Sequence, residues 1–214
     1  MLRVGVTGGV GSGKSVVTGM LRDLGAHVSQ SDEIGRTLMQ TGQPAYTAIL
    51  DYFGSDVLAA DGSLDRSVLA RIAFQDGRVE ELNGIVHPLV IAEQTRWASA
   101  VEAANPDAIA VIESALIFET RHAGKGEVPW RTRFDRIVVV TAPLQLRRQR
   151  SVGRGMSEHD FERRAAAQWP DEQKMALADF VVTNDGSLKD LKLEVERLWR
   201  ILRAEASDRT AESM

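Results

Sequence analysis

Eight residues near the N-terminus have the types and the spacing that phosphate binding requires. Residues 8–15 read Gly-Gly-Val-Gly-Ser-Gly-Lys-Ser, which matches the phosphate-binding loop pattern G-x-x-x-x-G-K-[ST]. In such a loop the glycines let successive backbone N–H groups turn inward around phosphate oxygens, and the following helix points its positive dipole end at the same anion. Lys14 has the reach to contact the β- and γ-phosphates, and the Ser15 hydroxyl can ligate Mg²⁺. The segment therefore predicts a site for a nucleoside triphosphate.

The residues on both sides of the loop support this interpretation. Residues 2–7 form an apolar segment rich in β-branched side chains, which predicts a buried strand. After the loop, apolar residues recur with the spacing of one helix face until Gly25, which is a typical helix end. A strand, the loop and a helix in this order distinguish a phosphate site from a chance glycine-rich turn.

Asp32 and a cluster of arginines are further candidates for chemistry. Asp32 follows an apolar segment at the sheet edge where ligands bind, so its carboxylate is a candidate general base; the alternative is that Asp32 and Ser31 cap a helix. Arginines occupy positions 147, 148, 150, 154, 163 and 164, and those at 147, 150 and 154 would share one helix face. An arginine that closes over a transferring phosphoryl group contributes about 10³–10⁵ in rate, but exposed arginines often form only a solvated face.

The elements that must position these residues follow an α/β pattern. Five apolar segments are expected to be strands: 2–7, 26–29, 108–112, 136–141 and 180–183. Helical patterns separate them, which favours a three-layer fold around a parallel sheet. Helices are also expected over 44–53, 65–74, 79–103 and 188–204, and Pro88 should kink or restart the third of these. Ser157 is expected to cap a helix with Asp160 three residues later.

The composition limits the possible settings and partners. The chain has 214 residues, enough for one α/β domain with insertions, and a net charge of −4, which gives no support to a nucleic-acid surface. It has no cysteine, which excludes disulfides and thiol catalysis. No apolar run approaches the ~20 residues needed to span a bilayer, and the first strand leaves no room for a signal peptide. We therefore expect a cytoplasmic protein with no nucleic-acid or membrane partner.

The loop is shared by several classes of protein, and other motifs narrow the choice. A GTPase would carry an Asn/Thr-Lys-x-Asp motif, and a transporter ATPase a Leu-Ser-Gly-Gly-Gln-like signature; neither is present. What remains is an N-terminal loop, a long helical insertion and an arginine-rich segment. This combination favours a kinase, in which an acceptor site and a closing lid exclude water from phosphoryl transfer.

The chain also resembles the dephospho-CoA kinase family, in motifs that follow the family's order from Leu2 to about Leu202. They are residues 7–15, Asp32, the tripeptide 87–89, and the segments 116–119 and 168–174, then Ala178-Asp179 followed by Asn184. The resemblance implies transfer of the ATP γ-phosphate to the ribose 3′-hydroxyl of dephospho-CoA, the last step of coenzyme A biosynthesis, with ATP and Mg²⁺. It also implies a P-loop core of residues 1–33, 106–146 and 173–204, a helical CoA domain over 34–105 and a lid over 147–172. Residues 205–214 are expected to be a disordered tail.

The same resemblance implies roles for individual residues. Those implied in catalysis are Asp32 as the base, Lys14, Arg148 and Arg154, with Arg147 as the alternative to Arg148. Those implied in ATP binding are Gly9, Gly11, Ser12, Gly13, Lys14, Ser15, Val16 and Asn184, the last near the adenine. Those implied in acceptor binding are Asp32, Arg36, His87 and Glu119, and the metal ligands are Ser15 and Asp32.

Two departures from the family keep other functions open. The family often has Asp-Ala-Asp where this chain has Gln30-Ser31-Asp32, so Asp32 is the sole candidate base. The family's Asp-x-Pro is replaced by Glu113-Ser114-Ala115. The alternatives are another P-loop nucleotide or small-molecule kinase, and a catalytically silent ATP-binding regulator. For the oligomeric state, a monomer or a small homo-oligomer is expected.

Overall fold

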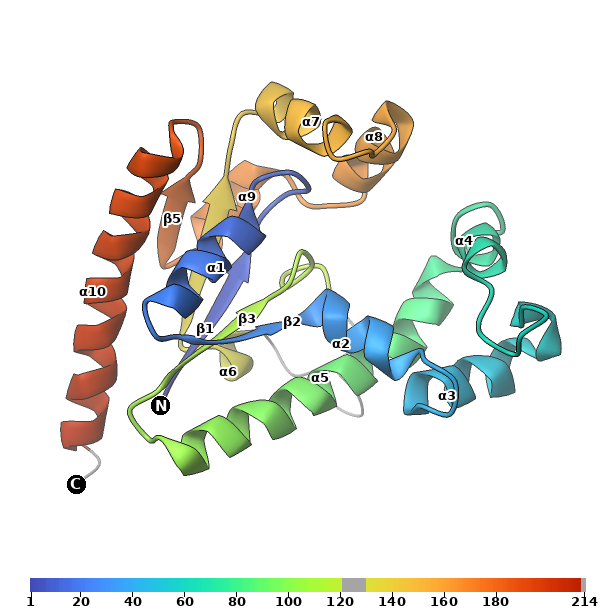
Figure 1. Ribbon diagram of the computed structural model, residues 1–214, viewed down its shortest axis with the longest axis horizontal. Helices are drawn as coiled ribbons and strands as arrows, with labels where there is room; N and C mark the ends of the chain where they lie inside the picture. The colour runs from blue at the N-terminus through green and yellow to red at the C-terminus, as the bar shows by residue number, and fades with distance from the viewer. Residues whose placement is uncertain (121–129, 213–214) are drawn as a thin grey trace. The chain divides into compact units, whose positions relative to one another are not determined.

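The computed structural model describes residues 1–120 and 130–212, with side chains as far as Arg209. Two compact units are present (Figure 1). One, which we call the sheet unit, comprises Met1–Ser29, Ala98–Glu119 and the chain from Trp130 onward. The other, which we call the helical unit, comprises Gln30–Trp97.

The described strands are β1 (Leu2–Thr7), β2 (His27–Gln30), β3 (Ile109–Glu113), β4 (Arg136–Thr141) and β5 (Phe180–Thr183). The described helices are α1 (Lys14–Asp23), α2 (Ser31–Leu38), α3 (Pro44–Phe53), the 3₁₀ turn η1 (Ser55–Val57), α4 (Arg66–Phe74), α5 (Val79–Ala104), α6 (Trp130–Arg133), α7 (Leu144–Val152), α8 (Glu158–Ala166), α9 (Asp171–Leu177) and α10 (Leu188–Glu212). Three strands coincide with the predicted ranges, and β2 and β3 each begin and end one residue later than expected.

The five strands form one sheet in the order β2-β3-β1-β4-β5. β1 lies at its centre and pairs in parallel with β3, where Leu2 is opposite Ile109, and with β4, where Val4 is opposite Arg136. β4 pairs in parallel with β5. The predicted α/β fold with a parallel sheet is therefore confirmed, and the carboxyl ends of its paired strands meet at one edge, where ligands bind in such folds.

One face of the sheet is covered by α1 and α10, which lies along the side of the sheet unit in Figure 1. Val17 and Leu21 of α1 are fully buried against the valines of β1. The apolar stripe of α10 supplies Leu191, Val195, Leu198 and Leu202 to the same cluster. The opposite side of β1 is covered as well, since a Cβ atom on Gly5 would lie within 3.1 Å of the side chains of Ile137, Ile117 and Phe134, all of them buried. Burial on both faces explains why β1 and β4 are almost continuously apolar.

The prediction of a disordered tail from residue 205 is wrong as far as Glu212, because α10 continues to that residue. Ala206 extends the apolar stripe one turn beyond Leu202 and is only 1% exposed. Arg209 forms an ion pair with Asp135 over 2.7 Å. The small, polar composition of residues 205–214 gave no indication that Ala206 lies on the buried face of the helix. Ser213 and Met214 lie outside the described residues.

Helix α5 is one element with Pro88 inside it, so the predicted restart at this proline does not occur. A proline removes one backbone hydrogen bond of a helix and crowds the preceding turn. Here the helix is held on both sides of Pro88 by apolar packing, since Leu82 and Ile85 belong to one cluster of the helical unit and Leu89 and Val90 to another. Tertiary packing therefore outweighs the local preference.

The cap predicted within the lid segment is confirmed. The Ser157 hydroxyl accepts a hydrogen bond from the backbone N–H of Asp160 over 3.1 Å and donates one to its carboxylate over 2.9 Å. This side-chain bond lowers the pKa of Asp160 below its usual value. Among the residues that the structure describes, no helix has the length and apolarity needed to cross a membrane.

Candidate functional site

The phosphate-binding loop, Gly8–Ser15, joins the end of β1 to the start of α1, as the sequence predicts. Gly13 caps α1 with φ of 96°, a left-handed conformation that favours glycine. A Cβ atom at this position would lie 2.1 Å from Nδ2 of Asn184. Only glycine therefore fits where the loop turns into the helix.

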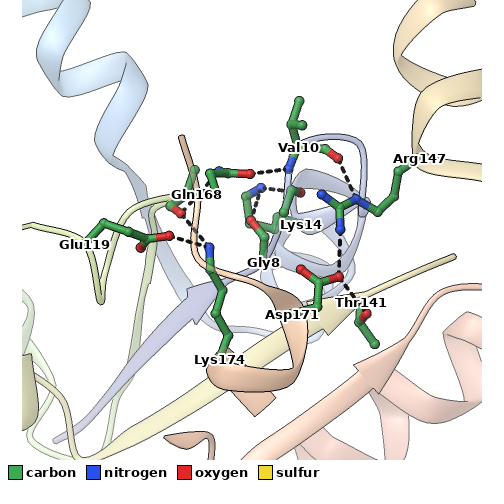
Figure 2. A network of polar contacts seen from close by, with 11 residues as sticks. Gly8, Val10, Lys14, Glu119, Thr141, Arg147, Gln168, Asp171 and Lys174 are labelled. Carbon is green, nitrogen blue, oxygen red and sulfur yellow. Dashed lines mark hydrogen bonds and ion pairs between the residues drawn. The ribbon is translucent and has the colours of Figure 1, made fainter. Parts of the chain in front are cut away.

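Within the loop, Lys14 folds back over the backbone that precedes it (Figure 2). Its Nζ donates to the carbonyl oxygens of Gly8 over 3.0 Å and Gly9 over 3.2 Å. Ser15 and Val16 are exposed in the first turn of α1, whereas Ser12 is buried. The ammonium and the Ser15 hydroxyl thus lie on the loop and helix start that form a phosphate site.

A pocket of about 460 Å³ adjoins the loop in the sheet unit. It is lined by Gly11, Gly13, Val16, Arg150, Gly153, Arg154, Asn184, Gly186, Leu188 and Leu191. Its position beside the start of α1 and its partly apolar lining suit the nucleoside part of a bound nucleotide. Among the predicted residues, the pocket brings together two loop glycines, Val16, Asn184 and Arg154.

Asn184 is buried, and its amide holds the protein itself together. Its Nδ2 donates to the carbonyl oxygen of Ser12 over 2.8 Å, and its backbone N–H donates to Thr141 over 2.8 Å. Arg150 donates to the backbone oxygen of Asn184 over 2.8 Å and to its Oδ1 over 3.3 Å. The sequence suggested an amide available to adenine, but in the structure this amide links the strand β5 end to the loop.

The arginines of the lid segment have three different environments. Arg147 is buried, with only 7% of its surface exposed, and donates to the backbone of the loop. Arg148 is half-buried, with 43% of its side chain exposed, and forms an ion pair with Glu162 over 3.0 Å. Arg150 and Arg154 line the nucleoside pocket. Sequence reasoning did not select Arg150, although its spacing from 147 and 154 on one helix face was the signal that could have found it.

Glu119 lies in a buried ion pair of the sheet unit. Its Oε1 is 2.7 Å from Nζ of Lys174, whose side chain is fully buried, and also accepts from the backbone N–H of Trp169 over 3.0 Å. Lys174 and Gln168 each donate over 3.4 Å to the carbonyl oxygen of Ala115. The sequence suggested that Glu119 binds the acceptor. The pairing with Lys174 was not predicted, although this lysine ends the motif 168–174, which was the signal that could have found it. At the end of β3, the other acid, Glu113, accepts a 2.7 Å hydrogen bond from Thr18.

Asp32, Arg36 and His87 belong to the helical unit. Asp32 is the second residue of α2, whose cap position is Gln30, so Asp32 is not the helix cap. Its side chain is exposed. His87 is half-buried on α5. Ser31, which precedes Asp32, is held by a side-chain hydrogen bond: its hydroxyl accepts from the buried Gln94 over 2.7 Å.

Arg36 lies one turn after Asp32 and donates from Nε to the backbone oxygen of Asp32 over 3.1 Å. It lines a pocket of about 290 Å³ within the helical unit, together with Met39, Gln40, Thr41, Ser63, Leu64, Arg66 and Leu69. Its two arginines and three apolar side chains suit a ligand that is partly anionic and partly apolar.

The donors available to a metal ion are few. The described residues contain no group of three or more His, Cys, Asp or Glu side chains that could hold one. This agrees with the habit of Mg²⁺, which keeps several waters and binds through one or two protein oxygens and substrate phosphates. The exposed Ser15 hydroxyl is such an oxygen, so the residues present fit a magnesium ion shared with a nucleotide.

Comparisons with known proteins agree with these features. The family model for dephospho-CoA kinase matches residues 2–190. A dephospho-CoA kinase of Frankia casuarinae is 40% identical over 95% of this chain and 85% of its own length. One from Aquifex aeolicus is 34% identical over 94% of this chain and 98% of its own length.

A solved structure shows the same fold. The crystal structure of a Thermus thermophilus protein, 30% identical, superposes with a TM-score of 0.75 over 95% of this chain and 97% of that one. The matched family region begins at β1 and extends into the first residues of α10, so it includes the loop, residues 147–172, the pocket of the helical unit and all of the pocket beside the loop except Leu191. This chain belongs to the dephospho-CoA kinase family.

Proposed function

We propose that this protein transfers the γ-phosphate of ATP to the ribose 3′-hydroxyl of dephospho-CoA. The observation that carries the proposal is a phosphate-binding loop beside a nucleoside-sized pocket in a chain of this kinase family. The backbone N–H groups of the loop and the start of α1 bind the phosphates, and Lys14 moves from its contacts with Gly8 and Gly9 to the β- and γ-phosphates.

Asp32 acts as the general base in this proposal. Its exposed carboxylate accepts the proton of the 3′-hydroxyl as the hydroxyl oxygen attacks the γ-phosphorus and ADP leaves. Arg36 and His87, on the same unit, bind the acceptor, with Arg36 contacting its phosphates. Since Glu119 is already paired with Lys174, we propose that it acts on the acceptor only through the shape of the segment after β3.

Arg154 closes on the transferring phosphoryl group, because it is exposed and already lines the nucleoside pocket. The part of Arg148 in catalysis stays a prediction, since its guanidinium is paired with Glu162. Replacing each arginine by alanine separates them: the loss in kcat should be much larger for Arg154→Ala. Equal losses would return Arg148 to a catalytic role.

Ser15 and Asp32 are the proposed protein contacts of Mg²⁺. When bound, the ion neutralises charge on the β- and γ-phosphates. Chelation with EDTA should abolish turnover, and added Mg²⁺ should restore it. A rate that survives complete chelation would remove the ion from the proposal.

The deciding experiment measures acceptor-dependent release of ADP. Purified protein is incubated with MgATP alone and then with dephospho-CoA, AMP or adenosine, and the product is tested as CoA. Turnover with dephospho-CoA alone supports the proposal. Turnover with AMP or adenosine instead would favour another P-loop kinase, and ATP binding without turnover on any acceptor would favour a silent ATP-binding regulator.

A further inference from the structure

Both backbone groups of Val10, the third residue of the phosphate-binding loop, are held by side chains from the C-terminal half of the chain (Figure 2). Its N–H donates to Oε1 of Gln168 over 2.8 Å. Its carbonyl oxygen accepts from Nε of Arg147 over 2.9 Å. We call Gln168 and Arg147 the Val10 clamp. Neither peptide plane beside Val10 can rotate without leaving a polar group of the loop unpaired.

Arg147 is fixed in place by partners of its own. Its Nη1 forms an ion pair with Asp171 over 2.7 Å, and the same carboxylate oxygen accepts from the Thr141 hydroxyl at the end of β4 over 3.0 Å. A Cβ atom on Gly9 would lie 2.1 Å from Nη2 of Arg147, so the guanidinium rests directly on the loop backbone. Removing one partner of a buried charge pair is costly, and this arginine is therefore held rather than free to swing toward a ligand.

Gln168 is also oriented by its surroundings. Its Nε2 donates to the carbonyl oxygen of Ala115, which leaves Oε1 for the N–H of Val10. The same carbonyl accepts from Lys174, whose ammonium pairs with Glu119. Both hydrogen bonds at position 115 are accepted by the backbone carbonyl oxygen. The alanine that this chain has in place of the family's proline therefore still makes these contacts.

We propose that Arg147 and Gln168 are positioning residues, which set the geometry of the phosphate-binding loop and make nucleotide affinity depend on the segment from α7 to α9. The inference rests on the use of ATP in the proposed function, but not on the identity of the acceptor. It assigns to Arg147 a role distinct from that of a lid arginine: it acts on phosphate through the loop and does not touch it.

The first test replaces Gln168 by methionine, which keeps the length of the side chain and removes the accepting oxygen. Affinity for ADP, measured by calorimetry without acceptor, should fall about tenfold, or about 1.4 kcal/mol. Hydrogen exchange of the Val10 amide, followed by NMR, should become faster. Because Gln168 is only half-buried, the melting temperature should change little.

Two further variants separate positioning from packing. Gln168→Glu keeps an oxygen that can accept from Val10 but loses the donor to the carbonyl of Ala115, so exchange at Val10 should be slower than in Gln168→Met. Gln173→Met, on the exposed face of α9, is the matched control and should alter neither ADP affinity nor Val10 exchange. If Gln168→Met binds ADP as the wild type does, or leaves the exchange of Val10 unchanged, the proposal is wrong.

The second side of the clamp needs a paired variant, because Arg147→Met alone leaves Asp171 without its cation. The double variant Arg147→Met/Asp171→Asn should recover stability and still lose ADP affinity to a similar degree as Gln168→Met. A double variant with wild-type ADP affinity would show that Arg147 only supports the fold, and would overturn its positioning role. None of these measurements uses dephospho-CoA, so a failure of the acceptor assignment would leave them intact.

Discussion

The phosphate-binding loop and the first turn of α2 are built in opposite ways. In the loop, the backbone of Val10 is bonded on both sides, and the carbonyl oxygen of Ser12 accepts from the buried Asn184. In α2, the carboxylate of Asp32 is exposed, and the described residues give it no hydrogen bond or ion pair. The protein thus fixes the groups that we propose to hold the donor phosphates and leaves its candidate base accessible.

This difference has a physical reason. Dipoles that stabilise developing charge act best when they are oriented in advance, because no reorganisation is then needed during the reaction. A general base must instead remain accessible to the hydroxyl that it deprotonates, and its hydrogen bonds often tighten only when substrate is bound. The comparison therefore predicts that changes at the loop affect stability and nucleotide affinity, whereas changes on α2 affect turnover or acceptor binding.

The largest effect is expected for Asp32→Asn. Loss of the base should lower kcat by about 10²–10⁴. Because the side chain is exposed, the melting temperature and the affinity for ADP measured without Mg²⁺ should remain those of the wild type. Steady-state kinetics and calorimetry measure both, with the exposed neighbour Glu33→Gln as the matched control. A large loss of ADP affinity in Asp32→Asn would break the comparison.

On the donor side, the corresponding change is Lys174→Met, which leaves the mostly buried Glu119 without its partner. The free energy of unfolding should fall by about 3–5 kcal/mol, as measured by denaturant titration. Lys192→Met, whose side chain is 68% exposed, is the control and should cost less than about 1 kcal/mol. If the two variants lose the same free energy of unfolding, the buried Lys174–Glu119 pair gives the loop no special support.

A smaller effect is expected for Asn184→Leu. It leaves the carbonyl oxygen of Ser12 without the donor it has now, at a cost of about 1–3 kcal/mol in stability. ADP affinity should fall as well, because the Asn184 amide joins the loop to β5. Thermal unfolding and calorimetry check both, with the exposed Asp185→Asn as control. A stable variant that binds ADP normally would contradict the idea that this amide organises the loop.

The smallest effect is expected for Arg36→Ala. The KM for the acceptor should rise about tenfold, which corresponds to the loss of one charged hydrogen bond of about 1.4 kcal/mol. ADP affinity should not change, since Arg36 belongs to the helical unit. Arg71→Ala, an exposed arginine on α4, is the control in the same assay. An unchanged KM would exclude Arg36 from acceptor binding. Arg66, which lines the same pocket, would then be the next candidate for this contact.

The parts of the molecule that local pattern determines could be predicted from the sequence. The loop and the strand and helix beside it follow from glycine spacing and apolar periodicity within about twenty residues. The Val10 clamp could not be predicted in this way, because its bonds join residues 137 and 158 positions apart.

The environment of individual side chains also could not be predicted from the sequence. Arg147 and Arg148 are adjacent in the sequence, yet Arg147 is buried against the loop and Arg148 is half-buried beside Glu162. Their difference depends on the rotation of α7, which the glycines after it made hard to assign. Lys174 likewise resembles any surface lysine until the fold buries it next to Glu119.

The position of β1 in the sheet has a consequence for how the protein is made. β1 leaves the ribosome before the other described strands, but its partners are β3 and β4, and Leu2 pairs with Ile109. At a synthesis rate of about 5–20 residues per second, roughly 5–20 s pass between the synthesis of β1 and that of β3, its first partner in chain order. During that interval the segment Gln30–Trp97 of the helical unit emerges. The apolar β1 thus stays without its sheet partners during this part of translation, and an exposed apolar strand is a segment that chaperones protect from aggregation.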